Sequence, residues 1–552
     1  MTVVVAAVLI GALLSAPLSA ILLWLFRRSL VRGMFGSVSR QPPVTAPASD
    51  NSDSNHKPLT ICIVAPSTRS NTCTETAQLS RAKASLRRSI VVYSLAGVVY
   101  ALLFGMGWAL QTPEGLNAWH RILGIAVYHL WPTVIAVGLI AATSRAERLR
   151  FAGFYFALLI AMSAWLLAIS PNLTAWQLVV LWLITNGPGT FFIGAFLHRR
   201  IRAVGPLVLA FLSLSMIGSY FAPLLLFRSE AWMRVAVTIG AKIKLGGGGT
   251  FWAVLIIGFL LWALASWWLI RRFADLYRRK QLSDQTLTLD ALFLVFTIDQ
   301  GITLETSGAH MYVGIAAFVA YKVIVEVGLR RFHLSQTTNP PPLLLYLRVI
   351  ALGHRGADLF DSFAKLWRRI GPIAIIAGPD LIRTTVEPHE FLEFLGGKMS
   401  RRFLSGEADM RRSVAALDNR PDPDRRYRVN QFFCHQNIWQ MTMHTLAIQS
   451  AAVLMDLRNF SAQNQGCLFE LGQLLNFIDL TQVVFLIDST TDREFLEHTL
   501  RELWLSVPAE SPNLHNSAPA VRFFLEQRGK APSANLLFRE LLTQRIPEQA
   551  AA

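Results

Sequence analysis

Two carboxylates near residue 460 carry the clearest chemical signal in this sequence. An apolar run ends at Asp456, a polar turn follows, and Glu470 lies near the start of the next helical segment. In open sheets of parallel strands, ligands bind at the carboxyl ends of the strands. We therefore predict that Asp456 and Glu470 lie at a ligand site and that both serve as catalytic residues.

A carboxylate in that position can stabilise positive charge that develops in a bound substrate, by its own charge, by hydrogen bonds or by covalent capture. Two structural roles compete with this chemistry. Glu470 in the first turn of a helix would gain ~0.3–1 kcal/mol from the helix dipole, and Asp456 at a strand end would cap the following turn.

Further candidate nucleotide-binding residues follow two neighbouring strand-like runs. Gly378, Pro379 and Asp380 could approach a nucleotide phosphate or base, although Gly-Pro is first of all a turn signal. His435 and Trp439 open the next helical segment, where they could contact a ribose or stack on a base. The alternative for both is a helix start that packs onto the sheet.

The sequence argues against several other kinds of site. Its four cysteines contain no Cys-x-x-Cys pair, so neither a zinc site nor a disulfide scaffold is indicated. Gly396-Gly397-Lys398 is not a phosphate-binding P-loop, because Leu392 and Met399 stand where Gly and Ser or Thr are needed. No Gly-x-Ser-x-Gly elbow occurs. We predict no metal and no bound cofactor.

Alternating strands and helices after residue 342 must position these side chains. Six short apolar runs have strand length, at 343–350, 373–377, 429–433, 452–456, 483–487 and 521–525. Amphipathic segments lie between them, with one helical face formed by Leu359, Phe360, Phe363, Leu366 and Trp367 and another by Phe495, Leu496, Thr499, Leu500 and Leu503. This order predicts right-handed βαβ units and a doubly wound parallel α/β sheet.

The C-terminal part resembles the TIR (Toll/interleukin-1 receptor) domain and its nucleoside deoxyribosyltransferase relatives. In TIR domains the stretch after the middle strand typically reads Ser-x-Trp-Cys-x-x-Glu-Leu, and 465–471 keeps the Cys, Glu and Leu at that spacing without the Trp. Deoxyribosyltransferases favour a Gly, an aromatic and a Glu followed by Gly, which are matched here by Gly466, Phe469, Glu470 and Gly472. The second-loop region, 388–424, is longer than is usual in TIR domains.

This resemblance covers roughly 343–542 and implies a TIR/flavodoxin-like fold with NAD as substrate. It implies that Glu470 and Asp456 act on the N-glycosidic bond and that Gly466 belongs to the nucleotide-binding residues. It also implies self-association through the TIR-like domain. The resemblance does not extend to the N-terminal part of the chain.

Composition places the N-terminal part in a membrane. A mean hydropathy of +0.40, with 53% hydrophobic and only 16% charged residues, is too apolar for a globular enzyme of 552 residues. The net charge of +17 is concentrated in short loops between apolar runs, so nucleic acid is not predicted as a partner. We predict nine spans, at 3–26, 90–110, 122–143, 151–169, 178–197, 207–227, 251–270, 287–303 and 310–329.

Loop charges predict the orientation of these spans. Basic residues cluster at 27–88, 145–150, 199–202 and 271–280, whereas the loops at 112–120 and 170–176 contain no Lys or Arg. By the positive-inside rule the basic loops face the cytosol. With nine spans, the N-terminus lies outside and the C-terminal domain is cytosolic. We predict a multi-pass protein of a bacterial plasma (cytoplasmic) membrane.

The predicted domains are a transmembrane domain at 1–333, a linker at 334–342 and an α/β domain at 343–552. A disordered cytosolic loop is predicted at 41–57, which is rich in Pro, Ser, Asn and Asp. The last two predicted spans contain Asp290, Asp299, Lys322 and Glu326, so they either pack within the bundle or lie at the interface.

Two function classes, and a less favoured third, remain open on sequence alone. In the first, a membrane sensor controls a cytosolic domain that cleaves NAD or a related nucleotide. In the second, the same domain binds a nucleotide or a partner protein without catalysis. Charges in the last two spans leave a transporter as the third. Catalysis needs Glu470 in an open cleft beside Asp456, whereas an enclosed or salt-bridged Glu470 favours binding alone.

Overall fold

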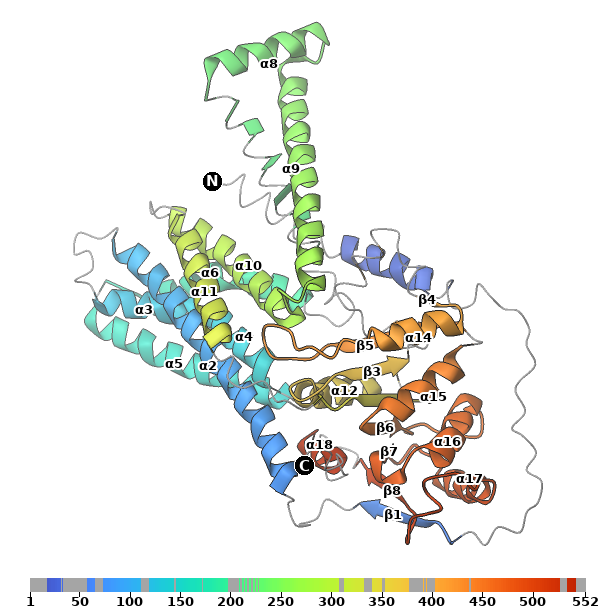
Figure 1. Cartoon of the computed structure of the whole chain (residues 1–552). Coiled ribbons are helices and arrows are strands. Elements are labelled where there is room, and N and C mark those ends of the chain that lie inside the picture. Colours follow the sequence, from blue (N-terminus) through green and yellow to red (C-terminus); the bar gives the residue numbers. More distant parts are fainter. Residues whose placement is uncertain are drawn as a thin grey trace. The chain divides into compact units, whose positions relative to one another are not determined.

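The structure is a computed structural model, and it divides into two compact units (Figure 1). The helical unit comprises Met1–Phe26, Arg88–Leu334 and Glu387–Leu392, and the α/β unit comprises Arg27–Arg87, Ser335–Val386 and Glu393–Ala552. The residues described are 17–30, 32, 57–64, 73–110, 119–142, 145–170, 172–196, 228–306, 312–331, 340–349, 353–376, 391, 394, 403–435, 438–526, 534–542 and isolated positions between 208 and 226.

The helical unit contains helices long and apolar enough to cross a membrane. Its described helices include α2 (Cys73–Ala109, which begins in the α/β unit), α3 (Trp119–His129), α4 (Trp131–Ala141), α5 (Arg145–Ile169), α6 (Ala175–Phe196), α8 (Glu230–Lys242), α9 (Gly246–Arg278), α10 (Asp284–Thr306) and α11 (Tyr312–Arg331). Five of those described qualify as single spans, namely α2, α5, α6, α9 and α11, and α3 with α4 would form a sixth that is bent by 43°.

The predicted spans correspond to these helices in part. Helix α10 covers the predicted span at 287–303 but is not among the candidate spans. Most of the predicted spans at 3–26 and 207–227 lies outside the described residues, as do the predicted disordered loop up to residue 56 and most of the predicted linker.

The bend between α3 and α4 follows from a proline. Pro132 has no backbone N–H, so the carbonyl of Tyr128, four residues earlier, cannot receive its helical hydrogen bond. Asn186 of α6 donates to that carbonyl from Nδ2 at 3.0 Å, and the Tyr155 hydroxyl donates to it at 3.4 Å. Side chains of neighbouring helices thus donate to the Tyr128 carbonyl, which has no helical hydrogen-bond partner because of the proline. Hydrocarbon surroundings require such a partner.

A buried chain of hydrogen bonds extends from this bend across the helical unit. Gln300 of α10 donates from Nε2 to Asn186 Oδ1 at 3.2 Å and accepts at Oε1 from the Tyr100 hydroxyl of α2 at 2.8 Å. Asn186 and Gln300 are both fully buried. One position beyond Pro188, the backbone N–H of Gly189 donates to Asp299 Oδ2 at 2.9 Å. The polar side chains therefore tie the helices together at two proline-containing segments.

The α/β unit contains an eight-stranded sheet in which every described pairing is parallel. The strands are β1 (Thr60–Val64), β2 (Leu344–Arg348), β3 (Ile373–Ile376), β4 (Phe403–Leu404), β5 (Val429–Cys434), β6 (Ala452–Asp456), β7 (Val483–Ile487) and β8 (Ala520–Leu525), in the order β1-β8-β7-β6-β2-β3-β5-β4. All six predicted strands are confirmed, and β1 and β4 are additional.

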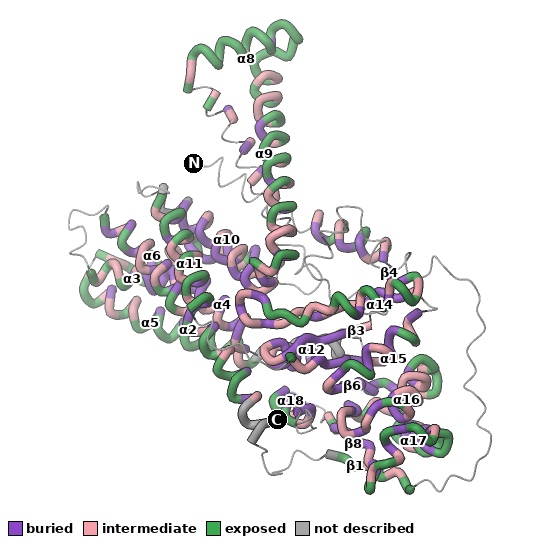
Figure 2. Tube along the Cα trace, viewed as in Figure 1, coloured by how far each residue is buried: buried purple, intermediate pink, exposed green. Residues whose placement is uncertain are grey.

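Helices cover both faces of the sheet. They are α12 (Gly353–Trp367), α14 (Glu407–Ala415), α15 (Trp439–Gln449), α16 (Gln465–Phe477), α17 (Arg493–Leu505) and α18 (Ala534–Leu542). Leu345 belongs to one buried cluster with side chains of α15, α16 and α17. Successive strand side chains point to opposite faces, and the neighbouring Tyr346 accordingly stacks on Phe360 of α12 at 4.9 Å between ring centroids. Strands β6 and β7 are buried along their whole length (Figure 2).

Strand β1 joins the sheet from the other end of the sequence. Its five residues pair with β8 from Thr60 opposite Ala520 to Val64 opposite Phe524. The Trp504 indole N–H donates to the carbonyl of Lys57 at 2.8 Å, which fixes the approach to the strand. The sequence-based division assigned this segment to the membrane part, whereas it belongs to the α/β unit.

Candidate functional site

The order of strands creates a switch point between β2 and β6. The chain passes from β2 to β3 on one side, and β6 lies on the other side of β2 and is followed by β7. The two strands pair in parallel and end together, with Arg348 opposite Asp456. Open α/β sheets bind ligands in the crevice outside the strand ends at such a point. Asp456 therefore lies at the expected edge of the sheet.

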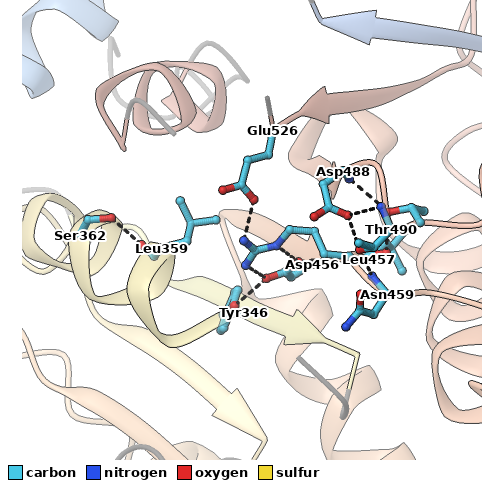
Figure 3. Close-up of polar contacts among 11 residues, drawn as sticks. Tyr346, Leu359, Ser362, Asp456, Leu457, Asn459, Asp488, Thr490 and Glu526 are labelled. Carbon is cyan, nitrogen blue, oxygen red and sulfur yellow. Dashed lines mark hydrogen bonds and ion pairs between the residues drawn. The ribbon is translucent and has the colours of Figure 1, made fainter. Parts of the chain in front are cut away.

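Asp456 is fully buried, and both of its carboxylate oxygens are engaged (Figure 3). Arg458 donates to Oδ1 from Nε at 2.8 Å and to Oδ2 from Nη2 at 2.6 Å, which is a bidentate pair. The hydroxyl of Tyr346, from the neighbouring strand, donates to Oδ2 at 3.1 Å. Burial and the negative charge of Asp456 raise the pKa of Tyr346 well above its ordinary value, so this hydroxyl stays protonated and donates.

Arg458 links this carboxylate to the end of β8, two strands away from β6 in the sheet. Its Nη1 donates to Glu526 Oε2 at 2.6 Å, and Glu526 directly follows β8. Burial opposes the charge of Arg458, but the hydrogen bonds and charge of Asp456, together with Glu526, outweigh it and raise the pKa of the guanidinium. These side chains form one hydrogen-bonded network, which we call the strand-end network. It consists of Tyr346, Asp456, Arg458 and Glu526.

The loop after β6 is held by contacts with the end of β7. The backbone N–H of Asn459, which has a φ of +60°, donates to Thr490 Oγ1 at 3.1 Å, and Thr491 Oγ1 donates to the carbonyl of Leu457 at 3.0 Å. The side chain of Asn464 then accepts the backbone N–H of Ser461 at 2.8 Å, just before α16 begins. These bonds fix where α16 leaves the sheet and therefore where Glu470 lies.

Glu470 lies in the second turn of α16, which begins at Gln465. Attraction to the helix dipole falls off within the first turn, so the dipole explanation considered above is weak. The residue as a whole is half-buried, but its Oε2 atom is enclosed and has no hydrogen-bond partner among the described residues. Burial raises the pKa of Glu470 from 4.5 to about 8, so the carboxyl is mostly protonated at neutral pH.

Cys467 connects the two predicted catalytic residues electrostatically. It is buried three residues before Glu470, on the same side of the helix. Burial, and then the negative charges that Glu470 and Asp456 carry when ionised, raise the pKa of its thiol. Both carboxylates thus affect the pKa of the same thiol, so Asp456 and Glu470 lie in one region of the unit. The protonated thiol is a weak nucleophile.

Two of the predicted nucleotide-binding residues lie together. A Cβ added at Gly466 would be 4.0 Å from Cη2 of Trp439, and the Trp439 ring meets Phe469 edge-on at 5.4 Å between centroids. Gly466 and Glu470 are four residues apart and share one face of α16. Trp439, Gly466 and Glu470 therefore border one side of this helix.

The other predicted contacts are placed differently. His435 follows β5, where its ring lies 5.4 Å from that of Phe403 and its backbone N–H donates to the carbonyl of Leu404 at 3.3 Å. Strand β5 is separated from β2 by β3. Gly378, Pro379 and Asp380 lie outside the described residues, so their contribution stays a prediction.

Sequence reasoning missed Tyr346, Arg458 and Glu526. Arg458 and Glu526 lie within two residues after the ends of β6 and β8, which was an available signal, whereas Tyr346 lies in the middle of β2. No group of three or more His, Cys, Asp or Glu side chains in the described part of the chain could hold a metal ion. Comparisons of the chain with protein-family models, curated proteins and solved structures found no match.

Proposed function

We propose that the chain is a multi-pass membrane protein whose α/β unit binds NAD or a related nucleotide and cleaves its N-glycosidic bond at Glu470. The observation that carries this proposal is that Glu470 is only half-buried as a residue, while its Oε2 atom has no hydrogen-bond partner among the described residues. A buried polar group without a partner costs about 1–3 kcal/mol. A ligand hydroxyl would supply the missing hydrogen bond.

The chemistry follows from the charge of the substrate. Nicotinamide in NAD is cationic, so its arrival would favour ionisation of the Glu470 carboxyl. The C1′–N bond then breaks, the bonding electrons leave with neutral nicotinamide, and the carboxylate stabilises the oxocarbenium-like ribosyl state. Water adds to C1′ and releases a proton. The products are ADP-ribose and nicotinamide.

The membrane part supplies location and control in this proposal. The chain lies in a bacterial plasma membrane with its N-terminus outside and the α/β unit in the cytosol. The helical unit senses a lipid, a ligand or the state of the bilayer. Copies of the chain self-associate through their α/β units, as the resemblance to TIR domains implies, and activity rises with that assembly.

A second candidate, nucleotide or partner binding without catalysis, is favoured by the enclosure of the site. Both oxygens of Asp456 are held by Arg458 and Tyr346. Glu470 Oε2 is itself shielded. Because catalysis needs Glu470 in an open cleft, enclosure of its carboxyl oxygen favours binding alone.

The test uses the full chain in lipid nanodiscs, assayed for NAD loss across a protein concentration series and after clustering on beads. Glu470→Gln should bind NAD but lose about 10²–10³-fold in rate, since such electrostatic stabilisation is worth ~3–4 kcal/mol. Glu502→Gln, at an exposed position on α17, is the matched control and should keep the wild-type rate. Unchanged turnover in Glu470→Gln would remove this residue from catalysis. Binding without turnover in the wild type would select the second candidate.

A further inference from the structure

Helix α8 carries most of its apolar side chains on one side and its polar side chains on another. Trp232, Val235, Ala236 and Ile239 follow the spacing of one helical face and form the apolar stripe. Trp232, Val235 and Ile239 are 63%, 47% and 54% exposed. Residues four apart form the polar stripe, namely Glu230, Arg234, Thr238 and Lys242, and this row turns gradually around the helix until Lys242 lies beside Val235.

The length and charge of α8 exclude both a spanning and a fully immersed position. Its 13 residues extend over roughly 20 Å, whereas the hydrocarbon layer is about 30 Å thick. The polar stripe runs from one end of the helix to the other and contains Glu230, Arg234 and Lys242. Arg234 pairs with Glu230 at 3.0 Å, but Lys242 adds an exposed positive charge that hydrocarbon would not accommodate.

The connection to α9 fixes the orientation of α8. Two residues at this connection have positive φ, Lys244 in the turn at +56° and Gly246 at the start of α9 at +66°. A Cβ at Gly240 would lie 1.9 Å from Thr250 Oγ1, so glycine permits direct contact between the helices. Helix α8 lies across the end of α9 (Figure 1). Since α9 is a candidate membrane span, α8 is directed along the bilayer surface.

The contact with α9 also shows which side of α8 faces the bilayer. Gly240 is four residues after Ala236 and therefore lies on the side of the apolar stripe. Thr250, its neighbour, lies in the first turns of α9, at the end where that helix enters its apolar segment. The apolar stripe is thus on the hydrocarbon side, and the polar stripe is on the water side.

We propose that α8 lies in the headgroup layer of the bilayer, with its apolar stripe in the acyl boundary and its basic residues on the phosphates of anionic phospholipids. Residues 228–245 contain Arg228, Arg234, Lys242 and Lys244 against the single carboxylate of Glu230. This excess of cations complements an anionic surface, where each Lys or Arg contributes ~1 kcal/mol. The interaction is independent of the reaction proposed for the α/β unit.

A spin-label scan of the full chain in nanodiscs tests the position of α8. Cys62 and Cys73 are first replaced by serine, since Cys434 and Cys467 are buried, and single cysteines are then introduced from 230 to 243. Labels at 232, 235 and 239 should be accessible to oxygen and shielded from a water-soluble nickel complex. Labels at 230, 234 and 238 should show the reverse. Nickel access at both stripes, or shielding of both stripes from both reagents, would overturn the proposal in favour of water or of a protein partner.

Lipid selectivity tests the headgroup contact. Spin-labelled phosphatidylglycerol should associate with the chain more strongly than spin-labelled phosphatidylcholine. Changing Arg234, Lys242 and Lys244 to Gln should reduce this preference about fivefold for each cation that contacts a phosphate, the equivalent of ~1 kcal/mol each. The control changes Arg411, Arg412 and Arg493 in the α/β unit to Gln, which alters net charge equally. An equal effect of both triple variants, or no effect of the first, would refute the assignment.

Discussion

Asn186 Nδ2 lies 3.0 Å from the carbonyl oxygen of Tyr128 and donates the hydrogen bond that Pro132 cannot. The bend between α3 and α4 is therefore stabilised by a side chain from α6, 58 residues away in the sequence. The same amide accepts from Gln300 of α10. Asn186 therefore joins α3, α6 and α10 through hydrogen bonds, and replacing it should change the stability of the helical unit by a measurable amount.

Asn186→Leu should lower the unfolding free energy of the full chain in detergent by about 1–2 kcal/mol, the upper range for interhelical hydrogen bonds in membranes. Gln300→Leu should have a similar effect. Because the two amides bond to each other, the double variant should lose less than the sum of the single variants. Thermal unfolding of the four proteins measures this coupling. Strict additivity would show that the bond between the amides contributes nothing.

Gly97→Ala should destabilise the helical unit by about 1–3 kcal/mol, the usual range for overpacking. A Cβ at position 97 would lie 2.0 Å from Thr133 Oγ1, so α2 and α4 would have to separate. Adding Thr133→Ala should recover part of the loss. Gly138→Ala is the control, because nothing lies within 4 Å of its added Cβ and alanine favours the helix. Equal melting temperatures for the two glycine variants would contradict this packing.

Arg458→Met should destabilise the α/β unit strongly, by about 3–5 kcal/mol, because it leaves the Asp456 carboxylate buried without its partner. Asp456→Asn combined with Arg458→Met should be less harmful than the sum of the two changes. Hydrogen exchange of β6 in the full chain gives the readout. Arg493→Met, which breaks an exposed pair with Glu497, should leave this exchange unchanged. Unaltered protection of β6 in Arg458→Met would show that the strand-end network is not needed there.

The stability of the α/β unit should fall as pH rises from about 5 to 8. The pKa of Glu470 is raised to about 8 in the folded chain, against 4.5 ordinarily, so in this range the folded state holds a proton that the unfolded state has released. The contribution of Glu470 is most favourable below its unfolded pKa and is lost as pH rises through the folded one. Hydrogen exchange of α16 across this range should therefore accelerate with pH beyond its chemical rate.

Glu470→Gln should remove that dependence, since the amide does not titrate. The variant should match the wild type near pH 5 and exceed it in protection near pH 8. Glu502→Gln should retain the wild-type slope. A pH slope that persists in Glu470→Gln would assign the titration to another group.

Local sequence was sufficient to predict six of the strands and the helix of Glu470. Strands of a parallel sheet are buried on both faces, so each appears as a continuous apolar run between turn residues. This signal lies within a few residues and needs no knowledge of neighbours. The position of Asp456 at a strand end, and of Glu470 in the helix that follows, came from the same pattern.

Tertiary structure alone decided the partners of these elements. Strand β1 was missed because its partner β8 lies about 460 residues further along the chain. The network around Asp456 is equally non-local, with Tyr346 110 residues before it and Glu526 68 residues after Arg458. Whether a carboxylate is paired, as at Asp456, or enclosed without a described partner, as at Glu470, depends on groups that only folding brings together. Periodicity records which side chains are buried, whereas hydrogen-bond partners are set by the packing of distant segments.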